Sequence, residues 1–330
     1  MGYDGKIIRR ALKKLEDIRF ERERSLRLLK QKLYAEIPRL EQIASELRLC
    51  GVAIAQSVIS AEDSRAAIAE IKARSNALRT ERAELLTRAG YPEDCLEDRP
   101  ACDSCGDSGY VGSAMCECLK ELCRVEQTEE LSDLFRIAPG RFRDFDLSLY
   151  SDKPYGEYPA SPRDNIKHKL TYCKKYADSF GPDSESIFIT GGCGLGKTYL
   201  SACIARTVVA AGYSVVYQTA YAVSRLFEEE RFSHDEELGD EISRLYNCDL
   251  LIIDDLGTEM TTSYTVAAVY DLINRRLVEG KKTVINTNLT TDEVAVRYNA
   301  QIASRIKDEY KILFIYGDSV RSEAAKRRRG

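Results

Sequence analysis

The first ninety residues alternate polar and apolar positions with a helical period and predict a helical region over residues 1–90. Apolar residues recur with a seven-residue repeat, and Pro38 should kink or break the helix because proline lacks an amide hydrogen. The members of this apolar seam are Ile8, Leu12, Leu15, Leu26, Leu29, Leu33, Leu40, Ile43 and Leu47. A capping-box-like pair, Ser60 and Asp63, predicts the start of a helix that runs to Ala89. The pattern predicts an antiparallel helical hairpin or short bundle, whose seam is either intramolecular core or a partner-binding face.

A different pattern begins at Ser186, where short apolar runs alternate with amphipathic stretches. Runs that are apolar at nearly every position are typical of parallel strands covered on both faces. The strand candidates are residues 186–190, 214–219, 249–255, 282–288 and 312–317. Helical stretches separate these runs, so residues 181–330 are expected to form an α/β domain, a parallel sheet flanked by helices.

Between these regions the chain changes composition twice. Residues 91–125 are rich in cysteine, and residues 126–180 form a linker that ends in a helix over about 163–180. The expected organisation is therefore a helical partner-binding region, a small cysteine module, a linker with its lead-in helix, and the α/β domain.

Charge narrows the classes of partner. The 330 residues carry a net charge of −4, which argues against a protein that coats nucleic acid without specificity. Residues 1–90 nevertheless hold 19 Lys and Arg against 13 Asp and Glu, and residues 1–32 alone hold 11 against 5. This basic arm is compatible with DNA, with an acidic partner surface, or with an ordinary solvated helix face.

The sequence also bears on location. No apolar run approaches the roughly 20 residues that a bilayer-spanning helix needs, and the charged N-terminus lacks the apolar stretch of a signal peptide. We therefore expect a cytoplasmic protein with no membrane contact. Eleven cysteines would indicate disulfides in a secreted chain, but six of them fall between Cys95 and Cys123, and that clustering requires another explanation.

The strongest motif lies directly after the first strand candidate. Residues 191–198 read Gly-x-x-x-x-Gly-Lys-Thr in the context of strand, loop and helix, which is the pattern of a phosphate-binding loop. Glycines let backbone amides turn toward phosphate, Lys197 supplies a positive charge to the β- and γ-phosphates, and the Thr198 hydroxyl is a magnesium ligand. The predicted nucleotide-binding residues are Gly191, Gly192, Cys193, Gly194, Leu195, Gly196, Lys197, Thr198 and Tyr199.

Two later strand ends supply the remaining groups for nucleotide chemistry. Asp254 ends a buried strand, which we expect beside the phosphate strand, where its carboxylate can hold Mg²⁺ through water. Asp255 follows directly and is placed to orient or deprotonate an attacking water. Asn288 ends the next strand, where its amide could contact the γ-phosphate.

The cysteine module has the spacing of a structural zinc site. A Cys-x2-Cys pair and a Cys-x-Cys pair flank a glycine-rich turn, and four thiolates can surround Zn²⁺ tetrahedrally. The predicted zinc ligands are Cys102, Cys105, Cys116 and Cys118. The second pair has one intervening residue where such pairs normally have two, so Cys95 or Cys123 could replace one of its members. The competing interpretation is a set of reduced thiols without metal.

Taken together, these motifs resemble one family. "IFITGGCGLGKTYLSACIARTVVAAGYSVVYQTA", "DLLIIDDLG", "TVINTNL", "IASRI" and "IYGDSVR" occur in the order and spacing of the AAA+ ATPases of the DnaC/DnaI helicase-loader and IstB transposition-helper group. The resemblance covers about residues 141–325. The segment Cys-x2-Cys-x-Asp-x-Gly-Tyr is similar to one that DnaI-type loaders carry ahead of the ATPase, in a region that engages the replicative helicase.

The resemblance implies roles for weaker positions. Asn288 would be the first sensor, Arg305 an arginine finger that reaches a neighbouring subunit's γ-phosphate, and Arg321 a second sensor in its own subunit. Hydrolysis would then require a homo-oligomer with ATP at subunit interfaces. Asp255 stands where most AAA+ members carry Glu, and the shorter arm would slow hydrolysis.

A helix after residue 219 resembles the insertion that contacts single-stranded DNA in this clade. Its Tyr221, Arg225 and Phe227 suit base stacking and phosphate contact, although three adjacent glutamates oppose a phosphate backbone.

The expected function is ATP-dependent loading or remodelling of a DnaB-type replicative helicase on single-stranded DNA, with ATP, Mg²⁺ and Zn²⁺ as cofactors. Two alternatives stay open. One is an IstB-like helper that delivers a transposase to target DNA, a class that usually lacks the cysteine cluster. The other is a scaffold that binds nucleotide with little turnover.

Overall fold

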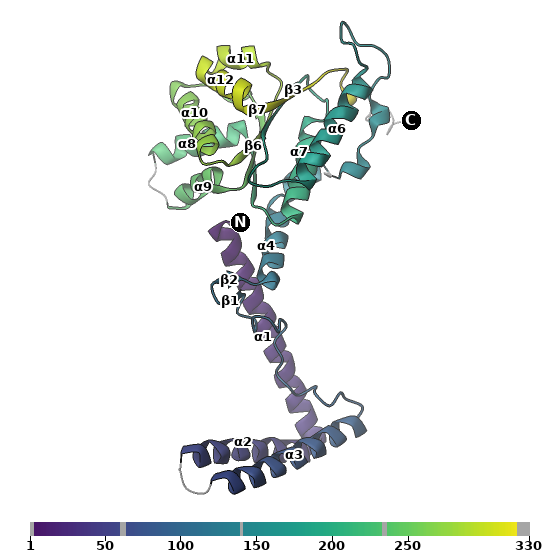
Figure 1. Ribbon diagram of the computed structural model, residues 1–330, viewed down its shortest axis with the longest axis vertical. Coiled ribbons are helices and arrows are strands. Elements are labelled where there is room, and N and C mark those ends of the chain that lie inside the picture. The colour runs from purple at the N-terminus through teal and green to yellow at the C-terminus, as the bar shows by residue number, and fades with distance from the viewer. Residues whose placement is uncertain (1–2, 60–63, 139–140, 233–235, 322–330) are drawn as a thin grey trace. The chain divides into compact units, whose positions relative to one another are not determined.

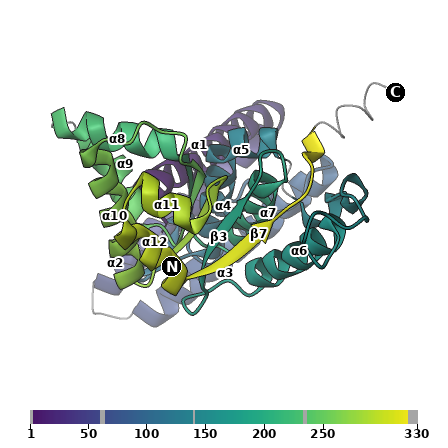
Figure 2. The same cartoon turned by 90° about the horizontal axis from the view of Figure 1, so that it is seen from above.

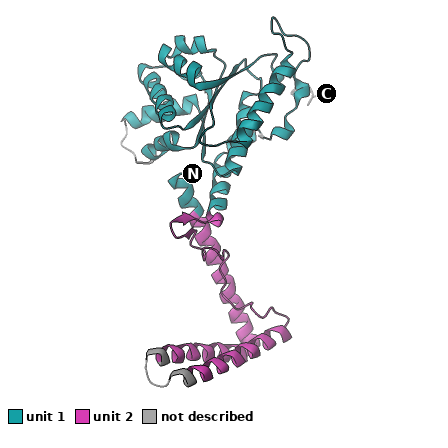
Figure 3. Ribbon diagram, viewed as in Figure 1, with its two compact units in different colours: residues 1–11, 120–330 teal, residues 12–119 magenta. Residues whose placement is uncertain are grey.

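The computed structural model describes residues 3–59, 64–138, 141–232 and 236–321. The chain divides into two compact units (Figure 3). Residues 12–119 form one, here called the helical unit, and residues 1–11 with 120–330 form the other, here called the C-terminal unit. This division places the helical region and the four predicted zinc ligands in one unit and groups the first eleven residues with the predicted α/β domain.

The helical unit is built from three helices and a small hairpin. They are α1 (Gly5–Glu36), α2 (Pro38–Ile59), α3 (Ser64–Arg88), β1 (Tyr110–Val111) and β2 (Ala114–Met115). Pro38 opens α2, which confirms the predicted break. Leu40 packs with Leu86, and Ile43 packs with Leu78, so α2 and α3 run antiparallel, as predicted. The capping pair Ser60 and Asp63 lies outside the described residues.

The C-terminal unit begins, after the first turns of α1, with a series of short elements and one longer helix. They are α4 (Glu117–Glu130), α5 (Ser132–Ile137), the 3₁₀ turns η1 (Phe142–Asp144) and η2 (Leu147–Leu149), and α6 (Pro162–Asp178). Ser161 caps α6 by accepting a hydrogen bond from the Asp164 amide. The predicted lead-in helix is therefore confirmed within two residues at each end.

A five-stranded parallel sheet forms the centre of this unit. Its strands are β3 (Ser186–Gly191), β4 (Val215–Thr219), β5 (Leu250–Leu256), β6 (Lys282–Thr287) and β7 (Tyr310–Ile315). The spatial order is β4-β5-β6-β3-β7, and every neighbouring pair is parallel. All five predicted strands are confirmed, and with them the predicted fold class.

Helices cover both faces of the sheet (Figures 1 and 2). The further elements are α7 (Lys197–Ala210), α8 (Ala220–Phe232), α9 (Glu236–Asn247), α10 (Ser263–Val278), α11 (Thr291–Arg297) and α12 (Ala300–Glu309). Along β3, Ile187 and Ile189 pack under α6 and α7, whereas Phe188 faces the core beneath α8, α10 and α12. This alternation explains why β3 is apolar at nearly every position.

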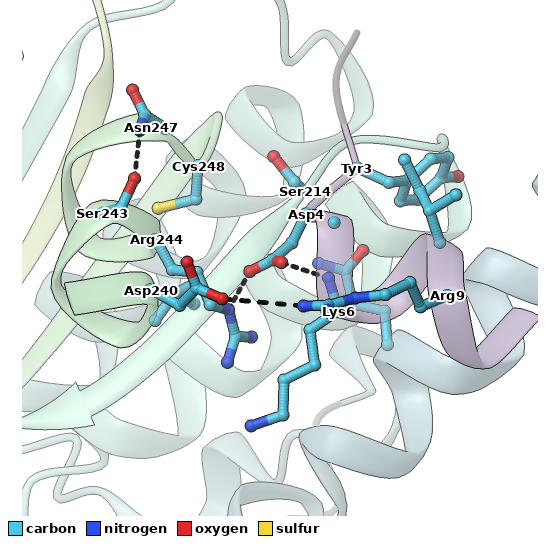
Figure 4. A pocket seen from close by; sticks show the side chains of 14 residues that line it. Tyr3, Asp4, Lys6, Arg9, Ser214, Asp240, Ser243, Arg244, Asn247 and Cys248 are labelled. Atoms are coloured by element: carbon cyan, nitrogen blue, oxygen red, sulfur yellow. Dashed lines mark hydrogen bonds and ion pairs between the residues drawn. The ribbon is translucent and has the colours of Figure 1, made fainter. Parts of the chain in front are cut away.

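Charged groups attach the first residues of the chain to α9. The Arg244 side chain, of which 10% is exposed, forms ion pairs with Asp4, Glu130 and Glu241, and Lys6 binds the same Glu241 at 2.7 Å. These contacts border a pocket of about 600 Å³ within the C-terminal unit (Figure 4). Each buried charge there has an opposite charge on a neighbouring element, so this part of the unit is electrostatically balanced.

Within the described ranges, every helix falls short of the length or the apolar content that a bilayer-spanning segment requires.

Candidate nucleotide and metal sites

The phosphate loop joins β3 to the first turn of α7, as predicted. Three of its glycines, Gly191, Gly194 and Gly196, have positive φ angles, of 146°, 73° and 88°. A Cβ on Gly191 would collide with the Ile315 carbonyl oxygen, and one on Gly196 would lie 2.7 Å from the Tyr150 hydroxyl. The loop therefore needs glycine both for its backbone conformation and for the close approach of neighbouring chain.

Lys197 projects into the curve of this loop. Its ammonium group donates to the carbonyl oxygens of Gly191 and Gly192, each at 2.8 Å, and to Oδ1 of Asn288 at 2.6 Å. Burial lowers the pKa of Lys197 below its ordinary value, although Cys193, Asp255 and Asp254 oppose the shift. The structure thus joins the predicted phosphate lysine directly to the predicted first sensor.

Asp254 is the centre of a buried polar network. Only 3% of the residue is exposed, and Oδ2 accepts hydrogen bonds from the hydroxyls of Thr198 at 3.0 Å and Tyr217 at 2.7 Å. Oδ1 accepts from the Asn286 amide at 2.9 Å and from the Asp255 backbone N–H at 3.1 Å. A buried carboxylate with four donors is held in one orientation, which a metal-binding role requires.

Asp255 differs from Asp254 in its exposure and in its backbone conformation. It is exposed and has a φ angle of 54°, a left-handed conformation that aspartate tolerates better than most residues. The ladder between β5 and β6 is irregular between Ile253 and Leu256, where this residue lies. Desolvation, followed by the Asp254 charge, raises the pKa of Asp255, while Lys197 and Arg321 oppose the shift. The bulge therefore turns this carboxylate out of the sheet while the one before it stays buried.

The expectation that the Asp254 strand lies beside the phosphate strand is wrong. β6 lies between β5 and β3, so Asp254 meets the loop through Thr198 on α7 and through Asn286 on β6. Asn286 is fully buried and also accepts from the Ser201 hydroxyl at 2.9 Å. Asn286 and Tyr217 were not among the predicted site residues, although a polar residue inside an apolar strand is a signal that pointed to Asn286.

Other predicted residues lie at the edges of this site. Val320 donates its amide to the Gly194 carbonyl at 3.0 Å, and the Cβ of Arg321 lies 3.4 Å from the position of a Cβ on that glycine. Cys193 is exposed, and its sulfur lies 3.8 Å from the Asn288 amide nitrogen. The chain segment after β7 is thus held against the loop, with the predicted second sensor beside it.

Tyr199 and Arg305 lie away from the lysine. The Tyr199 hydroxyl donates to the Arg141 carbonyl at 3.3 Å, and its ring meets Phe145 edge to face. Arg305 is exposed on α12 and makes no hydrogen bond or ion pair with any described residue. A free guanidinium on the surface is available to another molecule.

Helix α8 corrects one part of the DNA-contact expectation. Phe227 is 5% exposed and belongs to the core beneath the sheet, so it cannot stack on a base. Position 227 requires an apolar residue because it lies on the inner face of α8, which packs on β5. Arg225 pairs with Glu229 four residues later, and Tyr221 is 55% exposed.

The residues present fit a magnesium–nucleotide complex. Hydroxyl and carboxylate oxygens are the ligands that Mg²⁺ prefers, and Thr198 and Asp254 bring one of each within 3.0 Å. The positively charged lysine and the N-terminus of α7 face the same loop, which favours bound phosphate.

The four predicted zinc ligands converge in the helical unit. Their sulfur atoms all lie within 4.8 Å of one another, with Cys102 and Cys116 at 3.7 Å and Cys105 and Cys118 at 3.5 Å. A zinc–sulfur distance of about 2.3 Å separates the ligands of a tetrahedral site by about 3.8 Å. The short second pair is accommodated because the chain passes from β2 into α4 between Cys116 and Cys118.

Asp107 supports the first pair of thiols. It is 7% exposed, and its carboxylate accepts from the backbone amides of Ala101 and Cys102 and from Arg22 on α1. Burial raises the pKa of Asp107, but these hydrogen bonds and the Arg22 charge outweigh it and hold the pKa below its ordinary value.

Cys95 and Cys123 were the alternative ligands. Neither belongs to the group of converging sulfurs among the described residues, and burial raises the pKa of Cys123 to about 11. The geometry therefore favours the four cysteines that the spacing indicated.

Comparison with known proteins agrees with the motif-based resemblance. Residues 172–328 match the family model described as "IstB-like ATP binding protein". The chain is 26% identical over 158 residues to the replicative helicase loader DnaC of Escherichia coli K12, a match that covers 46% of this chain and 63% of that protein. It is 23% identical over 142 residues to the uncharacterized protein YdaV of the same strain, covering 42% and 56%.

Among solved structures, the crystal structure of DnaI covers 56% of this chain and 93% of its own, with 21% identity and a TM-score of 0.44. The crystal structure of the DnaC helicase loader has 18% identity and a TM-score of 0.44, and the match covers 53% of this chain and 98% of the loader chain. The sequence matches confirm the resemblance to DnaC-type AAA+ loaders for the C-terminal part, and the chain spans less than two thirds of the curated relatives that it matches.

Proposed function

We propose that this chain is an ATP-dependent DNA replication factor that loads or remodels a replicative helicase on single-stranded DNA. One observation carries the proposal: Lys197, Thr198, Asp254 and Asn288, all within the family-model match over residues 172–328, are joined in one site at the phosphate loop of a chain that is similar to DnaC. The C-terminal unit would bind ATP and Mg²⁺, and the helical unit with its zinc-bound thiols would hold the helicase.

Each residue of the nucleotide site has a separate task in this proposal. Lys197 would exchange its contact with Asn288 for phosphate oxygens, which frees the Asn288 amide to face the γ-phosphate. Asp254, fixed by its four donors, would hold Mg²⁺, which neutralises the phosphate charge when bound. Asp255 would orient the attacking water, and Arg321 would contact nucleotide in its own subunit.

Turnover would depend on assembly. The Arg305 guanidinium, free on α12, would reach the γ-phosphate of a neighbouring subunit and neutralise the charge that develops there. The shorter Asp255 side chain would make hydrolysis slow, which suits a step that times the release of a partner from DNA.

The central test is capture of the replicative DnaB-type helicase from the same host on the immobilised full chain, without nucleotide, with ADP and with ATP. We expect a complex whose stability changes with the nucleotide. The absence of a complex in all three states would contradict the proposal. Capture of a transposase in place of the helicase would favour the alternative of a transposition helper.

A mixing experiment tests the assembly and the scaffold alternative together. Arg305→Ala and Asp255→Asn should each hydrolyse ATP poorly, because each lacks one half of an interfacial site. Mixed in equal amounts with single-stranded DNA, they should recover activity, since some interfaces then combine an intact aspartate with an intact arginine. A wild-type chain that binds ATP but shows no turnover above the Lys197→Ala variant would identify a scaffold.

A further inference from the structure

A second pocket, of about 630 Å³, opens in the C-terminal unit between η1, α6 and α7. Four of the residues that line it are cations, namely Arg141, Arg143, Lys174 and Arg206, and none of its lining residues is acidic. We call it the basic pocket. Such a concentration of positive charge stands out in a chain whose net charge is −4.

The cations of the basic pocket have few partners within the protein. Arg206 stacks on the Phe135 ring at 4.0 Å, and its Nε atom is buried without a hydrogen-bond acceptor. The side chains of Arg141 and Lys174 make no hydrogen bond or ion pair with described residues. Only Arg143 has an acidic neighbour, the exposed Asp144 at 3.6 Å. Most of their hydrogen-bond donors are therefore available to an external anion.

The pocket beside α9 shows how this protein treats cations that serve the fold. There Arg244 forms ion pairs with Glu241 on its own helix and with Asp4 and Glu130 on other elements. Figure 4 shows Arg244 beside Asp4. Arg206, by contrast, is half-buried and forms no ion pair with a carboxylate of the described residues.

The lining of the basic pocket fits a nucleic-acid backbone better than one small anion. Its four cations come from three elements, and Phe142 adds an aromatic ring at the wall. The hydroxyls of Thr171 and Thr207 donate to carbonyls of their own helices, so they add no donors for a fixed anion geometry. Cations that follow a strand, with an aromatic beside them, are typical of sequence-independent contact with single strands.

The basic pocket is also connected to the phosphate loop. Its Arg141 carbonyl accepts the hydrogen bond from Tyr199, two residues after the phosphate lysine. Phe145 packs on the same tyrosine and on Tyr150, whose hydroxyl donates to the Leu195 carbonyl at 2.9 Å. These direct contacts connect the loop to the wall of the pocket, so a shift of the loop on nucleotide binding would be transmitted to it.

We infer that the basic pocket binds the phosphates of single-stranded DNA. The inference rests on the proposed function and adds to it a contact surface formed by Arg141, Lys174 and Arg206, separate from α8. Binding there responds to the nucleotide held by the loop.

The test measures binding of a fluorescent thymidine oligonucleotide to the full chain at several salt concentrations, with ADP and with a non-hydrolysable ATP analogue. The variants are the pair Arg141→Ala with Lys174→Ala, both exposed, and separately Arg206→Gln. Lys175→Ala is the matched control, because Lys175 is exposed on the same helix but lies outside the basic pocket. Nucleotide affinity of each variant confirms that the unit has folded.

We expect about tenfold weaker DNA binding for the double variant, and a salt dependence of log affinity that falls by about 0.7 for each lost phosphate contact. The control should match the wild type. Unchanged affinity and salt dependence would overturn the inference, as would loss of helicase capture with DNA binding intact, or equal competition by inorganic pyrophosphate. These outcomes would contradict only the inference about the basic pocket and would leave the proposed function standing. The proposed function would be contradicted if the wild-type chain bound the helicase in no nucleotide state. That result would not change the difference in DNA affinity between the wild type and the pocket variants.

Discussion

The phosphate loop and the thiol cluster bring chemically reactive groups together in opposite ways. At the nucleotide site, Lys197 of the loop and Asp254 of β5 are buried, and each is surrounded by hydrogen-bonding partners from the protein itself. In the cluster, four sulfurs converge mainly on one another. Thiols are weak hydrogen-bonding groups, so their mutual contacts contribute little to stability. The comparison therefore predicts that the loop forms from the chain alone, whereas the cluster requires a metal to complete it.

Removal of the metal should have the largest effect, and it should affect the thiol cluster but not the phosphate loop. Structural zinc contributes on the order of 10 kcal/mol or more to small metal-dependent folds, so Cys105→Ser or a strong chelator should unfold residues around 95–119. Metal analysis should find one zinc per wild-type chain and almost none in the variant, and proteolysis should cut the segment. Nucleotide affinity should remain.

Cys123→Ser is the matched control for this experiment, because its sulfur is buried outside the cluster. It should retain the metal. Wild-type protein purified without zinc and resistant to proteolysis in this segment would show that the thiols need no metal.

Lys197→Ala should have the next largest effect. It removes the ammonium group that three oxygen acceptors hold in the loop and that would contact phosphate. We therefore expect at least a hundredfold loss of ATP affinity, which corresponds to about 2.7 kcal/mol of binding free energy. Calorimetric titration with magnesium and ATP measures it. Lys281→Ala, a lysine that pairs with Asp249 elsewhere in the unit, should bind as the wild type does. Equal affinities for all three proteins would exclude a role for Lys197 in binding.

Asp107→Asn tests whether the residues around the thiol cluster contribute to its metal affinity. Asparagine keeps the shape and tolerates the φ angle of 63°, but it replaces one acceptor oxygen by an amide group. Groups that support metal ligands typically affect affinity by about 10- to 100-fold, and we expect zinc affinity to fall within that range. Competition with a chromophoric chelator measures this, with Asp103→Asn as the exposed control. An unchanged affinity would show that Asp107 serves the loop fold alone.

Tyr217→Phe should have the smallest effect. It removes one of the four donors to Asp254 and leaves the other three, so we expect a loss of about 1 kcal/mol in unfolding free energy. Denaturant titration of the full chain gives the change, and Tyr246→Phe, which removes an exposed bond to Asp271, is the control. A higher unfolding free energy for Tyr217→Phe would contradict this expectation and would show that the Tyr217 hydroxyl destabilises the fold while it orients the Asp254 carboxylate.

The amino-acid sequence by itself determined the features that depend on neighbouring positions. The five strands followed from apolar runs, the loop from contiguous glycine, lysine and threonine, and the group of four converging cysteines from their spacing. These features are local because they depend on backbone conformation and burial within a few residues.

Tertiary structure alone decided which of these local features meet. The insertion of β6 between β5 and β3 placed Asn286 against Asp254 and Asn288 against Lys197, which no pattern along the chain specifies. The burial of Phe227, the attachment of residues 1–11 to α9 and the gathering of cations in the basic pocket arose in the same way. Contacts between distant segments depend on crossover connections and on the packing of many side chains at once, and a local pattern does not encode either.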